Sequence, residues 1–212
     1  MYKKLQYISQ GQTNKKQLYN IHEALDAGCN WVQMRFKNQT AKETYTLAEA
    51  VKPLCEKYLA NFIVNDDLNL ALQIDADGVH LGLTDIKIDE ARKVLGTTKI
   101  IGGTANTFED IQNHVKNGCD YIGLGPFRFT NTKEKLSPIL GLSGYFDILQ
   151  KLKKNKINIP VYAIGGITLR DVNPLMETGI YGIAVSGIIT ESDEKQKLIQ
   201  QLNEKLNAKV IV

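Results

Sequence analysis

The sequence has few cysteines, no long hydrophobic run and little net charge, and each scarcity excludes a class of protein. Its 212 residues include three widely spaced cysteines without a CxxC pair, so we expect reduced thiols rather than a disulfide scaffold or a zinc site. No apolar run approaches membrane-spanning length, and the polar N-terminus is unlike a secretory signal. The net charge of +3 is spread without a basic run, which argues against nucleic-acid binding. We expect a cytoplasmic enzyme or binding protein without nucleic-acid or membrane partners.

Short β-like runs alternate with amphipathic, helix-like segments along the whole chain. Strands are expected at 5–9, 31–37, 61–66, 78–82, 99–104, 121–126, 160–166 and 182–187. Helices are expected after each strand, among them 15–27, 41–58 with an interruption or bend near Pro53, and 193–207. Eight such units predict an α/β fold, a single-domain (β/α)8 TIM barrel with a closed, parallel, eight-stranded sheet over residues 1–212.

The predicted strand at 31–37 has two faces of opposite chemistry. Successive side chains of a strand alternate in direction, so one face carries Val32, Met34 and Phe36 and the other carries Gln33, Arg35 and Lys37. Taken alone, this pattern is typical of an amphipathic surface strand. In a parallel sheet covered by helices both faces are buried, and two cations on the inner face then need an anion.

Polar side chains and glycines follow the predicted strands at the rim that carries the chemistry in barrel enzymes. Asp66 and Asp85 follow the third and fourth strands, and Mg²⁺ typically uses one or two carboxylates together with water and phosphate oxygens. Arg35, Lys37 and Lys133 are expected at the same rim, which favours a metal-assisted site for one anion, most simply a diphosphate. The alternative is that Asp66 or Asp67 caps the helix that follows the third strand and that Asp85 caps the next helix.

A second anion site is indicated after the seventh and eighth strands. Gly165-Gly166 and Ser186-Gly187 follow these strands, where barrels frequently bind phosphate through backbone N–H groups. The long segment 128–144 between the sixth strand and its helix is a candidate lid. His80 is expected to be a packed core residue rather than a general base, and His22 and His114 are expected on helices facing solvent.

Several motifs, taken in order along the chain, resemble those of the thiamine-phosphate synthase family. They are QMRFK at 33–37, ND at 65–66, DGVHLGLTD at 77–85, IIGGT at 100–104, TNTK at 130–133, AIGGI at 163–167 and VSGI at 185–188. The combination extends from the second strand to the eighth, and it is the ordered set rather than any single motif that is specific.

The resemblance implies transfer of the hydroxymethylpyrimidine group from its diphosphate to the ring nitrogen of a thiazole phosphate, in thiamine biosynthesis. It implies a Mg²⁺ cofactor on Asp66 and Asp85. The pyrimidine diphosphate would be bound by Gln33, Met34, Arg35, Phe36, Lys37, Asn65, Thr104 and Lys133, with catalysis assigned to Arg35, Lys37, Thr104 and Lys133. The thiazole phosphate would be bound by Thr130, Asn131, Thr132, Gly166, Val185 and Ser186. The implied mechanism is dissociative, with pyrophosphate leaving first, and it needs no general base.

The sequence departs from the family pattern at a few positions. Leu83 replaces the usual Gln, Thr104 replaces Ser with its hydroxyl retained, and Arg128 adds a cation. Two alternatives stay open, namely the related thiazole tautomerase, which has no diphosphate substrate, and a non-catalytic protein that binds thiamine phosphates. The expected partners are small phosphorylated substrates, and the sequence leaves homo-oligomer formation open.

Overall fold

Eight parallel strands form a closed barrel in the computed structural model, which describes residues 2–129 and 138–208. The strands pair in sequence order, and β8 closes the barrel by pairing in parallel with β1, with Ile183 opposite Leu5. The strands are β1 (Leu5–Ile8), β2 (Trp31–Met34), β3 (Asn61–Asn65), β4 (Gly78–Leu81), β5 (Ile100–Ala105), β6 (Tyr121–Leu124), β7 (Val161–Ile164) and β8 (Gly182–Val185). The predicted (β/α)8 fold is therefore confirmed.

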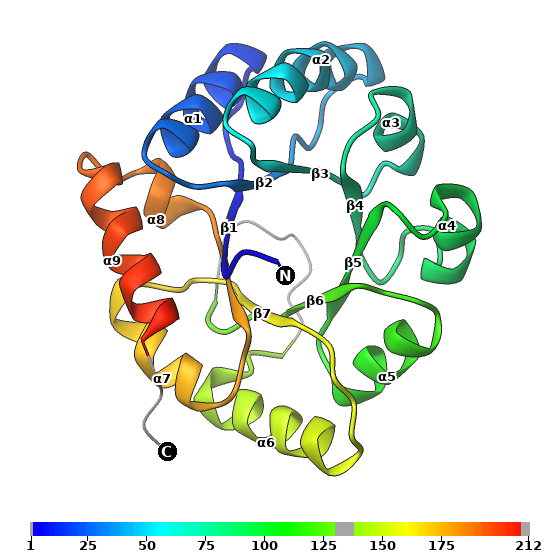
Figure 1. The fold of residues 1–212 in the computed structure, drawn as a ribbon, viewed down its shortest axis with the longest axis vertical. Coiled ribbons are helices and arrows are strands. Elements are labelled where there is room, and N and C mark those ends of the chain that lie inside the picture. The colour runs from blue at the N-terminus through cyan, green and yellow to red at the C-terminus, as the bar shows by residue number, and fades with distance from the viewer. Residues whose placement is uncertain (1, 130–137, 209–212) are drawn as a thin grey trace.

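Helices form a ring around this barrel (Figure 1). They are α1 (Asn14–Asp26), α2 (Ala41–Lys57), α3 (Leu68–Gln73), α4 (Ile88–Leu95), α5 (Phe108–Lys116), α6 (Gly141–Lys154), α7 (Val172–Glu177), α8 (Gly187–Thr190) and α9 (Lys195–Asn207), with a 3₁₀ turn η1 (Leu169–Asp171) before α7. The prediction of one helix per strand was wrong after β8, where the short helix α8 precedes α9. Of the interruption or bend predicted near Pro53, the interruption is absent, because α2 runs unbroken through that residue.

Two layers of apolar side chains fill the molecule. The larger layer lies between the strands and the helices, and Val32 and Met34 belong to it. The smaller layer fills the barrel interior at the N-terminal ends of the strands with large rings, including Trp31, Tyr121 and Tyr162. The Trp31 ring centroid lies 5.2 Å from that of Tyr121 and 5.3 Å from that of Tyr162. Polar groups inside the barrel are therefore concentrated toward the C-terminal ends of the strands.

Most strands end earlier than the sequence predicted, and this moves functional side chains into loops. Strand β2 ends at Met34, so Arg35 and Lys37 lie in the loop before α2 rather than in the sheet. Strand β3 ends at Asn65, and Asp66 turns the chain with a left-handed φ of 65°. The long loop after β6 ends at Leu140 instead of 144, because α6 begins at Gly141. Its residues 130–137 lie outside the described part of the chain.

The three histidines occupy three different environments. His80 on β4 is buried, as predicted for a packed core residue. His22 on α1 is half-exposed. The prediction that His114 faces solvent was wrong, because its ring is only 7% exposed and its Nε2 atom lies 2.8 Å from the carbonyl oxygen of Thr104. The ring packs over Gly103, where a Cβ atom would lie 3.0 Å from it.

Candidate active site

Two cations stand at the barrel mouth in the loop that follows β2. The backbone of Arg35 is held on both sides, since its N–H donates to Ser9 Oγ (3.0 Å) and its carbonyl accepts from Gln17 Nε2 (2.9 Å). The Arg35 side chain is half-buried, and this burial lowers its pKa while the charge of Asp66 opposes the shift. Lys37 forms an ion pair with Asp66. The loop therefore presents two cations beside a carboxylate.

Asp66 and Asp85 lie close together, as the magnesium prediction requires. Burial raises the pKa of the Asp85 carboxyl, and the neighbouring Asp66 raises it further, while the N–H of Gly82 donates to Asp85 Oδ2 (2.7 Å) and opposes the shift. Neither aspartate caps a helix, because Asp67 caps α3 and no side chain caps α4. Within residues 2–129 and 138–208, no cluster of three or more His, Cys, Asp or Glu side chains is arranged for a metal.

Gln33 and Asn65 form a neutral amide pair just inside the mouth. Gln33 Nε2 donates to Asn65 Oδ1 at 2.7 Å. Gln33 is 3% exposed, and its Oε1 atom has no hydrogen-bond partner among the described residues. Because a buried acceptor without a partner costs free energy, this oxygen is well placed to accept a hydrogen bond from a ligand.

Thr104, at the end of β5, is connected to the barrel interior by a chain of hydrogen bonds. Gln6 Nε2 donates to the Tyr121 hydroxyl at 3.1 Å, which lies 3.0 Å from His80 Nδ1, and His80 Nε2 lies 3.0 Å from Thr104 Oγ1. The network is satisfied if Tyr121 donates to Nδ1 and Nε2–H donates to Thr104, a tautomer assigned from these partners. The Thr104 hydroxyl proton is then available to a ligand.

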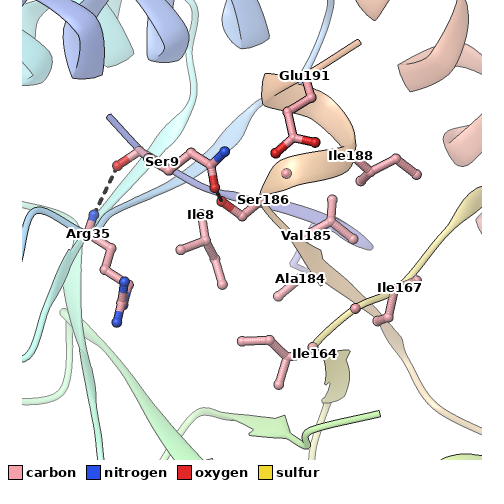
Figure 2. A pocket seen from close by; sticks show the side chains of 14 residues that line it. Ile8, Ser9, Arg35, Ile164, Ile167, Ala184, Val185, Ser186, Ile188 and Glu191 are labelled. Carbon is pink, nitrogen blue, oxygen red and sulfur yellow. Dashed lines mark hydrogen bonds between the residues drawn. The ribbon is translucent and has the colours of Figure 1, made fainter. Parts of the chain in front are cut away.

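A pocket of about 270 Å³, which Arg35 helps to line, lies beside the ends of β7 and β8. Gly166, Val185 and Ser186, which the family resemblance assigns to the thiazole phosphate, also line it. Figure 2 shows Arg35, Val185 and Ser186 around this pocket. Ser186 Oγ donates to Gln10 Oε1 at 3.0 Å. The short helix α8 begins directly after Ser186, an arrangement common at phosphate sites of barrels. The two predicted anion sites are therefore neighbours.

Sequence reasoning missed the contribution of the segment after β1. Ser9 and Gln10 line this pocket, and they also line a second pocket of about 290 Å³ that contains Arg35 and Lys37. The signal was available, because the polar residue Ser9 ends the predicted first strand and Gln10 follows it, as do the residues chosen from the other strand ends.

Two predicted site residues have side chains that point away from the mouth. Met34 and Phe36 point away from Gln33 into the core between sheet and helices, so the structure gives their side chains no place in a ligand site. Thr130, Asn131, Thr132 and Lys133 lie outside the described residues. Leu83 is 49% exposed.

A closed parallel barrel with cations, paired carboxylates and a pocket at the C-terminal ends of its strands has the architecture of barrel enzymes that act on phosphorylated compounds. Residues 5–189 match the family model of thiamine monophosphate synthase. The chain belongs to this family. The thiamine-phosphate synthase of Flavobacterium johnsoniae is 80% identical over 212 residues and 100% of both chains, and that of Flavobacterium psychrophilum is 61% identical over 97% of this chain and 100% of the relative.

A solved structure agrees with this assignment. The thiamine phosphate pyrophosphorylase from Pyrococcus furiosus superposes with a TM-score of 0.83 at 32% identity, covering 96% of this chain and 95% of that chain. The predicted enzyme class, a transferase of thiamine biosynthesis, and the predicted activity of thiamine-phosphate synthase are confirmed by these relatives. Among the described residues, no helix combines the length and apolar character needed to cross a membrane.

Proposed function

We propose that the chain transfers the hydroxymethylpyrimidine group from its diphosphate to the nitrogen of a thiazole phosphate, by a dissociative substitution that magnesium assists. The observation that supports this proposal is that the residues of the two predicted anion sites lie next to one another at one mouth. Arg35 borders the pocket beside β7 and β8, and it also lies near Asp66, whose charge opposes the lowering of its pKa. A reaction between two anionic substrates needs such neighbouring sites.

In this proposal the diphosphate binds to the charged groups of the loops after β2, β3 and β4. Arg35 and Lys37 supply positive charge where the leaving oxygen gains electrons. Lys133, outside the described residues, is assigned to the same task by its motif. The pyrimidine is placed deeper, where the unpartnered oxygen of Gln33 and the hydroxyl of Thr104 offer an acceptor and a donor.

The donor set fits Mg²⁺. Asp66 and Asp85 are hard oxygen ligands, and the raised pKa of Asp85 reflects a buried carboxyl beside a second one, a cost that a divalent cation relieves. Bound there, the ion would neutralise charge on the departing diphosphate. Lys37 already pairs with Asp66, so we expect this side chain to turn toward the diphosphate when the site is filled.

The bond that breaks and the bond that forms are then accounted for without a general base. The C–O bond of the pyrimidine substrate breaks with both electrons going to pyrophosphate, and the electron-rich aminopyrimidine stabilises the carbocation. The thiazole nitrogen attacks with its own lone pair, so no proton has to be removed. This agrees with His80, whose two ring nitrogens contact Tyr121 and Thr104 within the barrel interior.

The thiazole phosphate is assigned to the pocket beside β7 and β8. Gly166, Val185 and Ser186 line it, and Thr130, Asn131 and Thr132 are assigned by their motif alone. Ser186 is oriented by Gln10, which we add to the site as a positioning residue.

The compartment and the assembly are parts of the same proposal. All three cysteines are free, and burial raises the pKa of Cys29 to about 11 and that of Cys55 to about 12. These unreactive thiols agree with a cytoplasmic location. Self-association stays a prediction, and so does the assignment of all residues 1–212 to one catalytic domain.

The test is product formation from the pyrimidine diphosphate and the thiazole phosphate, with Mg²⁺ in one sample and a chelator in the other. Metal-dependent formation of thiamine phosphate and pyrophosphate in equal amounts is expected. Equal rates in the two samples would contradict the metal site. If a folded sample formed no product, we would turn to a tautomerase assay and then to a binding assay for a non-catalytic protein.

A further inference from the structure

Arg128, which lies just after β6, holds the loop that follows β7. Its backbone N–H donates to the carbonyl of Gly165 (3.0 Å), and its Nη1 atom donates to the carbonyl of Gly166 (2.8 Å). The same guanidinium makes a two-pronged ion pair with Asp171, at 2.8 and 2.7 Å. Arg128 thus connects the chain after β6 to the chain after β7.

These bonds fix the orientation of two consecutive peptide groups. In a trans peptide the N–H points opposite to the carbonyl. Since the carbonyls of Gly165 and Gly166 both point to Arg128, the N–H groups of Gly166 and Ile167 point away from it. Gly165, Gly166 and Ile167 line the 270 Å³ pocket and Arg128 does not, so both N–H groups lie on the pocket side. Neither donates a hydrogen bond to another residue within 2–129 and 138–208.

The backbone of this loop needs glycine for conformation and for space. Gly165 and Gly166 have φ angles of +99° and +67°, which other residues rarely adopt. A Cβ atom on Gly166 would lie 2.9 Å from the Cβ atom of Arg128. Successive N–H groups presented in this way form a concave anion site, and a guanidinium bonded to the Gly166 carbonyl makes the N–H of the same peptide a stronger donor.

Asp171 fixes the arginine from the outer side. One carboxylate oxygen of Asp171 accepts from the N–H (2.8 Å) and hydroxyl (2.7 Å) of Thr168 in addition to Arg128. The guanidinium also lies 4.8 Å from the centre of the Phe127 ring. Arg128, Asp171 and Thr168 form what we term the Arg128 clamp. The clamp reaches the pocket lining through the carbonyls of Gly165 and Gly166.

We propose that Arg128 and Asp171 are positioning residues that direct the N–H groups of Gly166 and Ile167 at the phosphate of the thiazole substrate. This inference rests on the proposed placement of that substrate in the pocket beside β7 and β8. A clamp that only stabilised the fold would change the stability of the protein without affecting one substrate more than the other.

The test is steady-state kinetics of Arg128→Ala with each substrate varied in turn. We expect the KM for the thiazole phosphate to rise about tenfold, the effect of weakening hydrogen bonds to a charged group, while the KM for the pyrimidine diphosphate and kcat stay unchanged. The KM of Arg128→Lys for the thiazole phosphate should lie between those of Arg128→Ala and the unmodified protein. Lysine retains the positive charge but loses the paired N–H donors of the guanidinium. Arg170→Ala is the matched control, since Arg170 is an exposed neighbour of Asp171 with no ion pair to another described residue.

A second variant separates failure of this inference from failure of the substrate placement. Ser186→Ala removes a hydroxyl group from the pocket lining and leaves the residues of the clamp unchanged. If Ser186→Ala raises the thiazole phosphate KM and Arg128→Ala does not, the clamp has no positioning role. If neither variant raises it, the placement itself is wrong and the inference fails with it. Two other results would also overturn the inference. One is that Arg128→Ala raises the KM values for both substrates by the same factor. The other is that Arg128→Ala is insoluble while Arg128→Lys has unchanged kinetics.

Discussion

Removal of one buried hydroxyl, in Tyr121→Phe, should lower both stability and turnover. The ring of Tyr121 is fully buried among the aromatic side chains of the barrel interior, and phenylalanine retains that packing. The hydroxyl lies 3.1 Å from Gln6 Nε2 and 3.0 Å from His80 Nδ1. Both side chains are nearly inaccessible to water, at 1% and 5% exposure, so the substitution removes the Tyr121 hydroxyl as a hydrogen-bond partner from two buried groups.

The expected loss follows from these two groups. Removing the hydrogen-bond partner of a buried donor or acceptor costs about 1–3 kcal/mol, so for two such groups we expect the free energy of unfolding to fall by about 2–6 kcal/mol. At roughly 2–4 °C per kcal/mol for a protein of this size, the melting temperature should fall by roughly 4–24 °C. Turnover should fall as well, because His80 then holds the hydroxyl of Thr104 less firmly.

Urea denaturation of Tyr121→Phe beside Tyr162→Phe is the decisive assay. Tyr162 belongs to the same aromatic cluster. Within the described part of the chain its hydroxyl makes one hydrogen bond, to the carbonyl of Lys3 at 2.6 Å, and Lys3 is exposed to water. Tyr162→Phe should therefore cost less than about 1 kcal/mol and leave kcat unchanged. If the two variants had equal midpoints at equal m-values, or if Tyr121→Phe retained full turnover, the reasoning about the interior network would be wrong.

Three further outcomes are expected. Asp66→Ala and Asp85→Ala should each abolish turnover while circular dichroism shows an intact fold, and near-normal activity in either would exclude that residue from the metal site. Asp85→Asn should raise the melting temperature of the metal-free protein, because it removes a buried charge beside a second carboxylate; a lower melting temperature would contradict this. The bonds from Arg128 hold the pKa of Asp171 at about 2, below its ordinary value of 3.8, so the ion pair stabilises the fold above pH 4 and is lost as the pH falls toward 2. Arg128→Ala should therefore cost about 1 kcal/mol at pH 7, after discounting for a half-exposed arginine, and a denaturation series should show that difference shrinking below pH 4.

The sequence was most informative about elements that depend on local pattern. Alternation along β2 placed Gln33 inside the barrel and Val32 outside it, because strand geometry has a fixed period of two. Counting β and α segments predicted the barrel, since only a closed parallel sheet accommodates eight such units without an edge. The same rule placed Asp66 and Asp85 at one rim, and the structure brings their carboxyl groups together.

Features that depend on contacts distant in sequence were beyond such reasoning. The burial of His114 depends on Gly103 leaving room beside β5, and neither residue alone predicts it. Arg128 was recognised as an added charge, but its partner Asp171 lies 43 positions away and is paired only once β6 and β7 are adjacent. Strand β2 ends early, at Met34, where the next backbone N–H, that of Arg35, donates a hydrogen bond to the side chain of Ser9.

The aromatic rings that fill the N-terminal end of the barrel also determine how molecules enter and leave it. Tyr2 packs its ring against Trp31 at 5.2 Å, its carbonyl accepts a hydrogen bond from the Tyr181 hydroxyl, and the N-terminal chain crosses that end of the barrel (Figure 1). With that end filled, both substrates arrive and both products depart through the same opening. Each product therefore blocks the approach of the next substrate until it leaves, and we expect pyrophosphate and thiamine phosphate to inhibit the enzyme as they accumulate.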